Sequence, residues 1–147
     1  MTKKKELDVV FLLDRSGSMQ GSETDTIGGY NSYLEQQRKN KFNTKITTVL
    51  FVITTDGLEN ASREYNKDKI KSLIEQHSNW EFIYIGANID SYGEGTSIGI
   101  PRKNISNYSK SKKGTDTLFR SINYLSECMY MNEEFNESWK KELENTK

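Results

Sequence analysis

Three polar side chains that could bind one metal ion follow the first apolar segment of the chain. The apolar run of residues 9–13 ends at Asp14, and Ser16 and Ser18 follow at alternate positions. One carboxylate and two hydroxyls within a few residues could all reach the same cation, and Gly17 allows the chain to turn sharply there. Oxygen ligands of this kind suit Mg²⁺, Mn²⁺ or Ca²⁺ better than Zn²⁺. The spacing therefore predicts a hard-cation site at the end of this segment.

The apolar run itself predicts a buried strand. Three of its five residues are aromatic or β-branched and none is polar, as is typical of a strand that helices cover on both faces. Residues 45–55 are also rich in β-branched and aromatic side chains, which predicts a second strand. In open α/β sheets ligands bind beyond the carboxyl ends of the strands, where the loop after residue 13 would lie.

Helices and further strands alternate along the next part of the chain. Ile27, Tyr30 and Leu34 recur at helical spacing, and Asn66 is a typical cap for a second helix. The expected elements are a helix over residues 24–39, a helix between residues 66 and 77, a strand over residues 80–87, at most a short helix between residues 90 and 100, and a short strand over residues 104–108. This alternation predicts an α/β fold with a mostly parallel, Rossmann-like sheet flanked by helices in three layers.

The C-terminal part of the sequence predicts two more helices. The first has an amphipathic pattern and should cover the sheet; its apolar positions are Leu118, Phe119, Ile122, Leu125 and Met129. In the second, Phe135, Trp139 and Leu143 recur every four residues among charged side chains. We divide the chain into a domain of residues 1–131 and a C-terminal amphipathic helix or tail of residues 132–147. The apolar stripe of the tail either packs back onto the domain or docks to a partner or a second copy.

Composition argues against several classes of function. The 21 basic and 21 acidic side chains cancel, so no overall field attracts nucleic acid or an anionic membrane. No segment has the length of a transmembrane helix, and residues 1–14 lack the pattern of a signal peptide. The single cysteine, Cys128, excludes an internal disulfide, and we expect it to be a small core residue. We therefore expect a cytoplasmic protein that binds neither nucleic acid nor membrane.

The polar segments after the two strands resemble motifs of one protein family. Residues 14–18 (Asp-Arg-Ser-Gly-Ser) are similar to the DxSxS signature of von Willebrand factor A (VWA) domains. Residues 54–57 (Thr-Thr-Asp-Gly) resemble that family's later strand-and-Asp motif. Compact cytoplasmic bacterial and phage members are the most similar, and the resemblance implies a shortened VWA-like fold with a metal-ion-dependent adhesion site (MIDAS). The metal ligands that it implies are Asp14, Ser16, Ser18 and Asp56, the last directly or through water.

In that family the metal ion accepts a carboxylate from a partner protein, which completes the coordination shell. The resemblance implies the same role here: a metal-dependent protein-binding module and not an enzyme, with Mg²⁺, or else Mn²⁺ or Ca²⁺, as the cofactor. The physical chemistry agrees, because a divalent cation with an open position attracts an anionic oxygen strongly. The residues expected to line the rim of this site are Gly17, Gly57, Glu59, Asn60, Asn88 and Asp90.

The sequence departs from the family pattern between residues 39 and 56. Family members have further strands and helices in this section, together with the threonine that completes the metal site. Residues 47–57 instead resemble the end of the family's second strand joined directly to its fourth, so the site loses one ligand. Substitutes could come from Thr24, Thr26 or Thr55, none of which stands at a matching position.

The missing section also changes the expected surroundings of the first strand. This strand is central in the family, but here one of its sides would be unfilled and would form an exposed apolar edge. We therefore expect a homo-oligomer, such as a dimer that buries this edge. Because strand–helix–strand crossovers are almost always right-handed, we also expect the helix over residues 24–39 to move to the other face of the sheet.

Two other interpretations remain. Ser16 and Ser18 could simply hydrogen-bond the turn while Asp14 caps backbone amides, and the chain would then be a structural or self-assembly protein with a vestigial metal site. A metal-dependent phosphatase would use Asp14 as nucleophile, as haloacid-dehalogenase-type enzymes do. Those enzymes need a second acid two residues later, where this chain has Ser16, and His77 fits the end of a helix better than a catalytic role.

Overall fold

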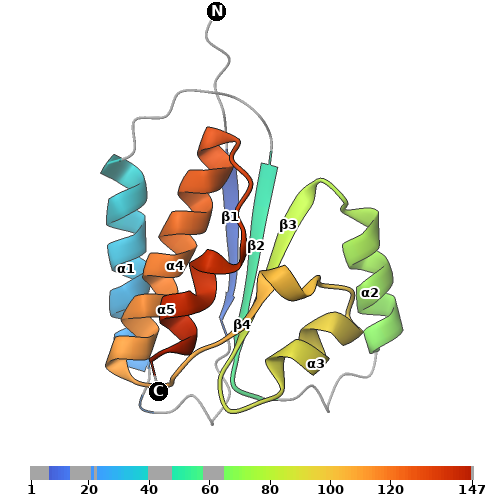
Figure 1. Cartoon of the computed structure of the whole chain (residues 1–147), viewed down its shortest axis with the longest axis horizontal. Helices are drawn as coiled ribbons and strands as arrows, with labels where there is room; N and C mark the ends of the chain where they lie inside the picture. Colours follow the sequence, from blue (N-terminus) through green and yellow to red (C-terminus); the bar gives the residue numbers. More distant parts are fainter. Residues whose placement is uncertain (1–6, 14–20, 22, 40–47, 58–64, 147) are drawn as a thin grey trace, which may run out of the picture.

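The computed structural model describes residues 7–13, 21, 23–39, 48–57 and 65–146. Within these residues four strands alternate with helices, in the order expected from the sequence (Figure 1). The elements are β1 (Leu7–Leu13), α1 (Glu23–Lys39), β2 (Thr48–Thr55), α2 (Lys67–Gln76), β3 (Trp80–Gly86), α3 (Ser91–Ser97), η2 (Arg102–Asn104), β4 (Ile105–Asn107), α4 (Lys112–Met131), η3 (Glu137–Lys140) and α5 (Lys141–Glu144). No helix among them is both long enough and apolar enough to cross a bilayer.

All four strands run parallel, in the spatial order β1-β2-β3-β4. Leu13 at the end of β1 lies beside Thr54 of β2, and Thr55 lies beside Gly86 of β3. Gly86 in turn pairs with Asn107 at the end of β4. The carboxyl ends of all four strands therefore meet at one edge of the sheet, and the predicted parallel α/β fold is confirmed.

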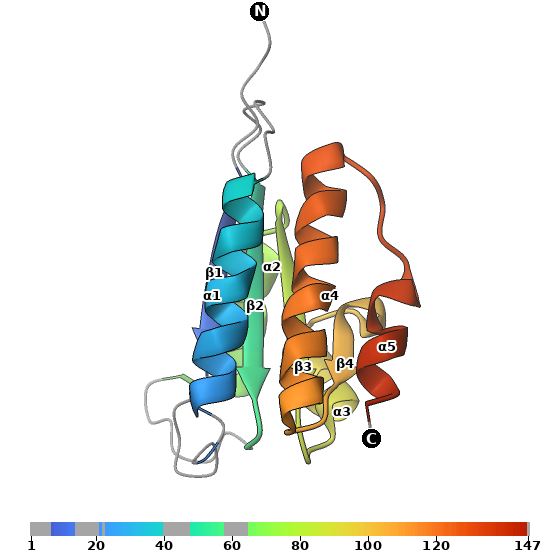
Figure 2. The same ribbon diagram turned by 90° about the vertical axis from the view of Figure 1, so that its left-hand side faces the viewer.

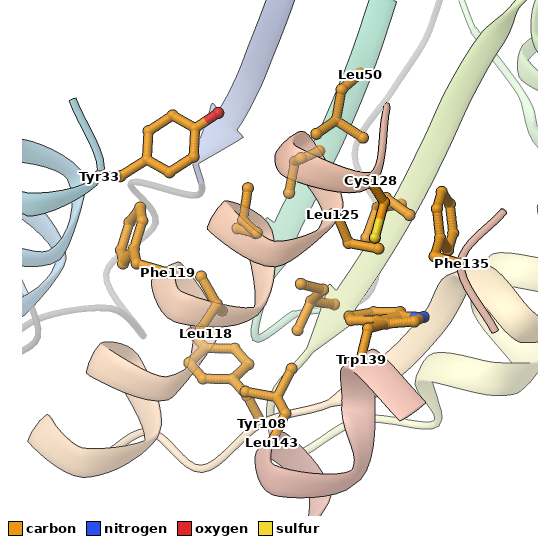
Figure 3. Close-up of a cluster of buried hydrophobic side chains, with 14 of the residues drawn as sticks. Tyr33, Leu50, Tyr108, Leu118, Phe119, Leu125, Cys128, Phe135, Trp139 and Leu143 are labelled. Atoms are coloured by element: carbon orange, nitrogen blue, oxygen red, sulfur yellow. The ribbon is translucent and has the colours of Figure 1, made fainter. Parts of the chain in front are cut away.

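Helices cover the two faces of the sheet separately (Figure 2). On one face, α1, α4 and the C-terminal turns enclose a cluster that includes Leu50 and Val52 of β2. Figure 3 shows side chains of this cluster gathered around α4. On the other face, side chains of α2 and α3 pack with Tyr84 and Phe82 of β3. The structure thus has the three layers expected from the sequence.

The first crossover has an unusual hand. Because β1, β2 and β3 follow one another in one direction, right-handed crossovers would place α1 on the same face as α2. Instead α1 shares its cluster with α4, and α2 lies across the sheet from both. The β1–α1–β2 connection is therefore left-handed, as Figure 2 shows. The expectation that this helix would change faces to keep the crossover right-handed is wrong, and its packing against α4 gives the physical reason.

The contact between α1 and α4 combines close packing with a buried hydrogen bond. Gly29 of α1 lies so close to Phe119 of α4 that a methyl group at Gly29 would overlap the phenyl ring. The hydroxyls of Tyr33 and Ser126 are 2.8 Å apart and buried. Burial raises the pKa of Tyr33, although the Ser126 hydroxyl partly opposes the shift, so this tyrosine stays neutral. These contacts hold α1 on the face that α4 covers.

The apolar stripe of the C-terminal tail packs onto the sheet domain. Phe135, Trp139 and Leu143 are buried in the same cluster as α4, and the indole Nε1 of Trp139 donates a hydrogen bond to the carbonyl oxygen of Lys103 at 2.8 Å. The interpretation that this stripe packs back onto the domain is confirmed. Cys128 is buried in the cluster as well, as expected for a small core residue.

The neighbouring glycines of α1 give a test of the α1–α4 contact. Gly28 is exposed and has open space where a methyl group would be placed, so Gly28→Ala should raise the free energy of unfolding by about 1 kcal/mol through helix propensity. Gly29→Ala should lower it by about 1 to 2 kcal/mol, because overlap with Phe119 outweighs the same gain. Urea denaturation of both variants measures this difference, and equal shifts would contradict the contact.

Candidate functional site

The structure describes part of the predicted site. Asp14, Ser16, Gly17 and Ser18 lie outside the described residues, as do Glu59 and Asn60. Asp56, Gly57, Asn88 and Asp90 are described, and all of them follow the carboxyl ends of β2 or β3. The described part of the site therefore begins at the end of β2 and continues into the loop after β3.

The ends of the strands bring distant parts of the chain to one edge. The amide of Ala87, just after β3, donates to the carbonyl oxygen of Thr55 at 2.9 Å. The amide of Tyr108, just after β4, donates to the carbonyl oxygen of Gly86 at 3.0 Å. Leu13, the residue before Asp14, pairs with Thr54 on the other side of β2. The carboxyl ends of all four strands therefore lie side by side at this edge.

Asp56 begins the turn that follows β2. The hydroxyl Oγ1 of Thr55 accepts a hydrogen bond from the amide of Gly57 at 3.1 Å, which closes a local turn around Asp56. The side chain of Asp56 is only 3% exposed. A buried carboxylate is costly unless a positive charge or hydrogen-bond donors compensate for the lost water.

Lys110 supplies a positive charge to Asp56. Its ammonium nitrogen is 2.8 Å from Oδ2 of Asp56, and its side chain is 21% exposed. Lys110 lies between β4 and α4, directly before Ser111, whose hydroxyl caps α4 by accepting from the amide of Gly114. The cap and the helix thus fix the backbone from which Lys110 reaches the end of β2. No motif surrounds this lysine in the sequence, so sequence analysis had no signal by which to find it.

The neighbourhood of Asp56 has the chemistry of a cation site. Its carboxylate oxygen already contacts a cation, and Oγ1 of Thr54 is buried two residues earlier without a hydrogen-bond partner. Among the described residues no three His, Cys, Asp or Glu side chains cluster in a way that could hold a metal. Carboxylate and hydroxyl oxygens are the types of ligand that suit a hard cation such as Mg²⁺.

Asn88 and Asp90, the predicted rim residues in the loop after β3, line a cavity of about 960 Å³. Asn88 is exposed and adopts a left-handed backbone conformation (φ 58°), which asparagine tolerates better than most residues. Oδ1 of Asp90 accepts from the amide of Gly93 at 3.0 Å and so caps α3. The cavity is also lined by Lys110 and Arg102. Lys110 therefore both pairs with Asp56 and lines this cavity.

His77 has a structural role. Its backbone caps α2, its Nδ1 lies 2.7 Å from the carbonyl oxygen of Leu73, and its ring packs on Trp80 with 4.2 Å between ring centroids. The expectation that His77 belongs to the end of a helix is confirmed.

Comparison with family models, with curated proteins and with solved structures gives no match for this chain. The resemblance of residues 14–18 and 54–57 to VWA motifs therefore stays a prediction.

Proposed function

We propose that this protein is a metal-dependent protein-binding module. A divalent cation of the Mg²⁺ type, bound at the carboxyl edge of the sheet, would bind an acidic group of a partner protein. The observation that supports this most is the buried carboxylate of Asp56, which follows β2 and contacts a cation, Lys110. The strand beside it, β1, leads directly into Asp14.

The proposed ligands belong to two neighbouring strand ends. Asp56 would hold the ion from β2, directly or through water, and Asp14, Ser16 and Ser18 would hold it from the loop after β1. Mg²⁺ often keeps several waters, so a few protein oxygens suffice, and Mn²⁺ or Ca²⁺ could be held by the same oxygens. When bound, the ion supplies an open coordination position for a carboxylate. A cytoplasmic location fits a chain with one cysteine.

Metal binding is tested by calorimetric titration with Mg²⁺ and Mn²⁺. We expect one ion per chain, and Asp14→Ala should weaken binding at least about tenfold, which corresponds to about 1.4 kcal/mol. Glu75→Ala is the control, because Glu75 is an exposed acid near the end of α2, which leads into the amino end of β3 and so lies away from the carboxyl edge of the sheet. The absence of binding to the wild type, or equal binding by Asp14→Ala, would contradict the proposal.

Recognition of an acidic group is tested with a random peptide library selected on the Mg²⁺-loaded protein. The selected peptides should be enriched in Asp and Glu, and a chelator should release them because the ion forms the contact. Replacing the acidic residue of a selected peptide by its amide should abolish binding, and the Asp14→Ala protein should not retain the peptide. Peptides that bind regardless of chelator and of Asp14→Ala would instead favour a structural protein with a vestigial site.

We also propose that the protein forms a homodimer through β1. In the part of the chain that the structure describes, β1 pairs with β2 alone and forms one edge of the sheet. Val10 and Leu12 point away from the α1–α4 face and are exposed, Leu12 by 54%. An apolar edge strand with unpaired backbone groups is a template for another strand, and a second β1 related by a two-fold axis would complete it.

Sedimentation at micromolar concentration tests the dimer. The wild type should sediment as a dimer, and Leu12→Lys should be monomeric because a charge at the paired edge has to lose its water. Leu73→Lys is the control, since Leu73 on α2 is also exposed (38%) and belongs to a helix whose side chains pack with β3. A monomeric wild type, or a dimer that persists in Leu12→Lys, would rule out this interface.

A further inference from the structure

The Asp56–Lys110 ion pair differs from the Lys112–Asp116 pair in its surroundings. Lys112 and Asp116 on α4 are 2.9 Å apart, nearly the same distance, but their side chains are 75% and 45% exposed. Asp56 is 3% exposed, so water cannot replace a lost partner there as it can for Asp116. A nearby cation therefore stabilises the carboxylate of Asp56 more than it stabilises the solvated carboxylate of Asp116.

Two cations that shared this carboxylate would repel each other. A divalent ion bound to Asp56 would lie within a few ångströms of the Lys110 ammonium, where poorly screened like charges repel strongly. Lysine carries its charge on a flexible four-carbon chain, so the ammonium can move away while the capped start of α4 stays in place.

We propose that Lys110 is the exchangeable counter-ion of the metal site. Its ammonium occupies Asp56 in the metal-free protein, and a divalent cation displaces it. This inference rests on the proposed metal-dependent function, to which it adds the residue that sets the metal affinity.

The structure offers the displaced lysine a place to go. Lys110 already lines the cavity of about 960 Å³, where the side chain of Asp90 can balance its charge. Arg102 lines the same cavity, with its guanidinium carbon 4.7 Å from the centre of the Tyr92 ring. Glu144 lines the cavity as well, so the released ammonium would lie among side chains of both charges.

Calorimetric titration with Mn²⁺ of the wild type, Lys110→Met and Lys112→Met tests the exchange. Lys110→Met keeps most of the side-chain volume without the competing charge, so it should bind Mn²⁺ at least about tenfold more tightly, a change of about 1.4 kcal/mol. Lys112→Met should bind like the wild type, because Lys112 pairs with Asp116.

The possible failures are distinct. Equal Mn²⁺ affinity of wild type and Lys110→Met would overturn the exchange and leave the metal-binding function standing. Absence of binding by both proteins would overturn the exchange and the proposed function together.

A second measurement needs no variant and so does not depend on the folding of Lys110→Met. Acetylation of the wild type with an amine-reactive ester, followed by mass spectrometry, reports the accessibility of each lysine. Mn²⁺ should raise the rate at Lys110 several-fold, because its ammonium leaves a buried pair, whereas Lys112 serves as the internal control. An unchanged rate at Lys110 in protein that binds Mn²⁺ would overturn the exchange.

Discussion

The packing of α4 is the constraint on which most of the described structure depends. Its buried side chains, among them Leu118, Ile122 and Leu125, form the centre of the larger core cluster. The same helix holds α1 through Phe119 and through the Tyr33–Ser126 hydrogen bond. Burial of this apolar surface is the main favourable term in folding, at about 25 cal/mol per Å². A helix near the end of the chain thus determines where the first helix lies.

This dependence accounts for the hand of the first crossover. The preference for right-handed connections comes from the twist of strands and is a strong statistical rule. That preference concerns only the path of the connection, whereas the position of α1 is stabilised by its packing against α4. Gly29 allows α1 to approach Phe119 closely, and Tyr30 and Leu34 pack on the same cluster. A helix on the other face would lose all of these contacts.

The sequence predicted the elements of the fold and only part of their arrangement. Runs of β-branched and aromatic residues identified β2 and β3, and Asn66 marked the start of α2, where its side chain accepts from the amide of Lys69. These signals are local, so they can be found without knowledge of the fold. The left-handed crossover depends on contacts between distant segments, for which the local patterns carry no information. The spacing of Trp139 marked an apolar stripe, but the surface on which that stripe packs could not be read from it.

The candidate site likewise contains one residue that the sequence predicted and one that it did not. Asp56 could be found from the sequence because it ends an apolar strand, and parallel strands bring their carboxyl ends together. Lys110 could not, because the only feature that relates it to Asp56 is the spatial order of β2, β3 and β4. An ion pair between residues of two loops has no spacing in the sequence that would predict it.

The two proposed interactions of β1 constrain each other. Among the described residues, the strand that leads into Asp14 is also an edge strand of the sheet. If two copies pair through β1 in antiparallel fashion, their sheets join, and the carboxyl edges of the two copies point in opposite directions. The seven residues of β1 span roughly 20 to 25 Å at about 3.3 Å per residue. The two proposed metal sites would then lie at opposite ends of the paired β1 strands, too far apart to bind the same carboxylate. Such a dimer would therefore bind two acidic groups, one at each site.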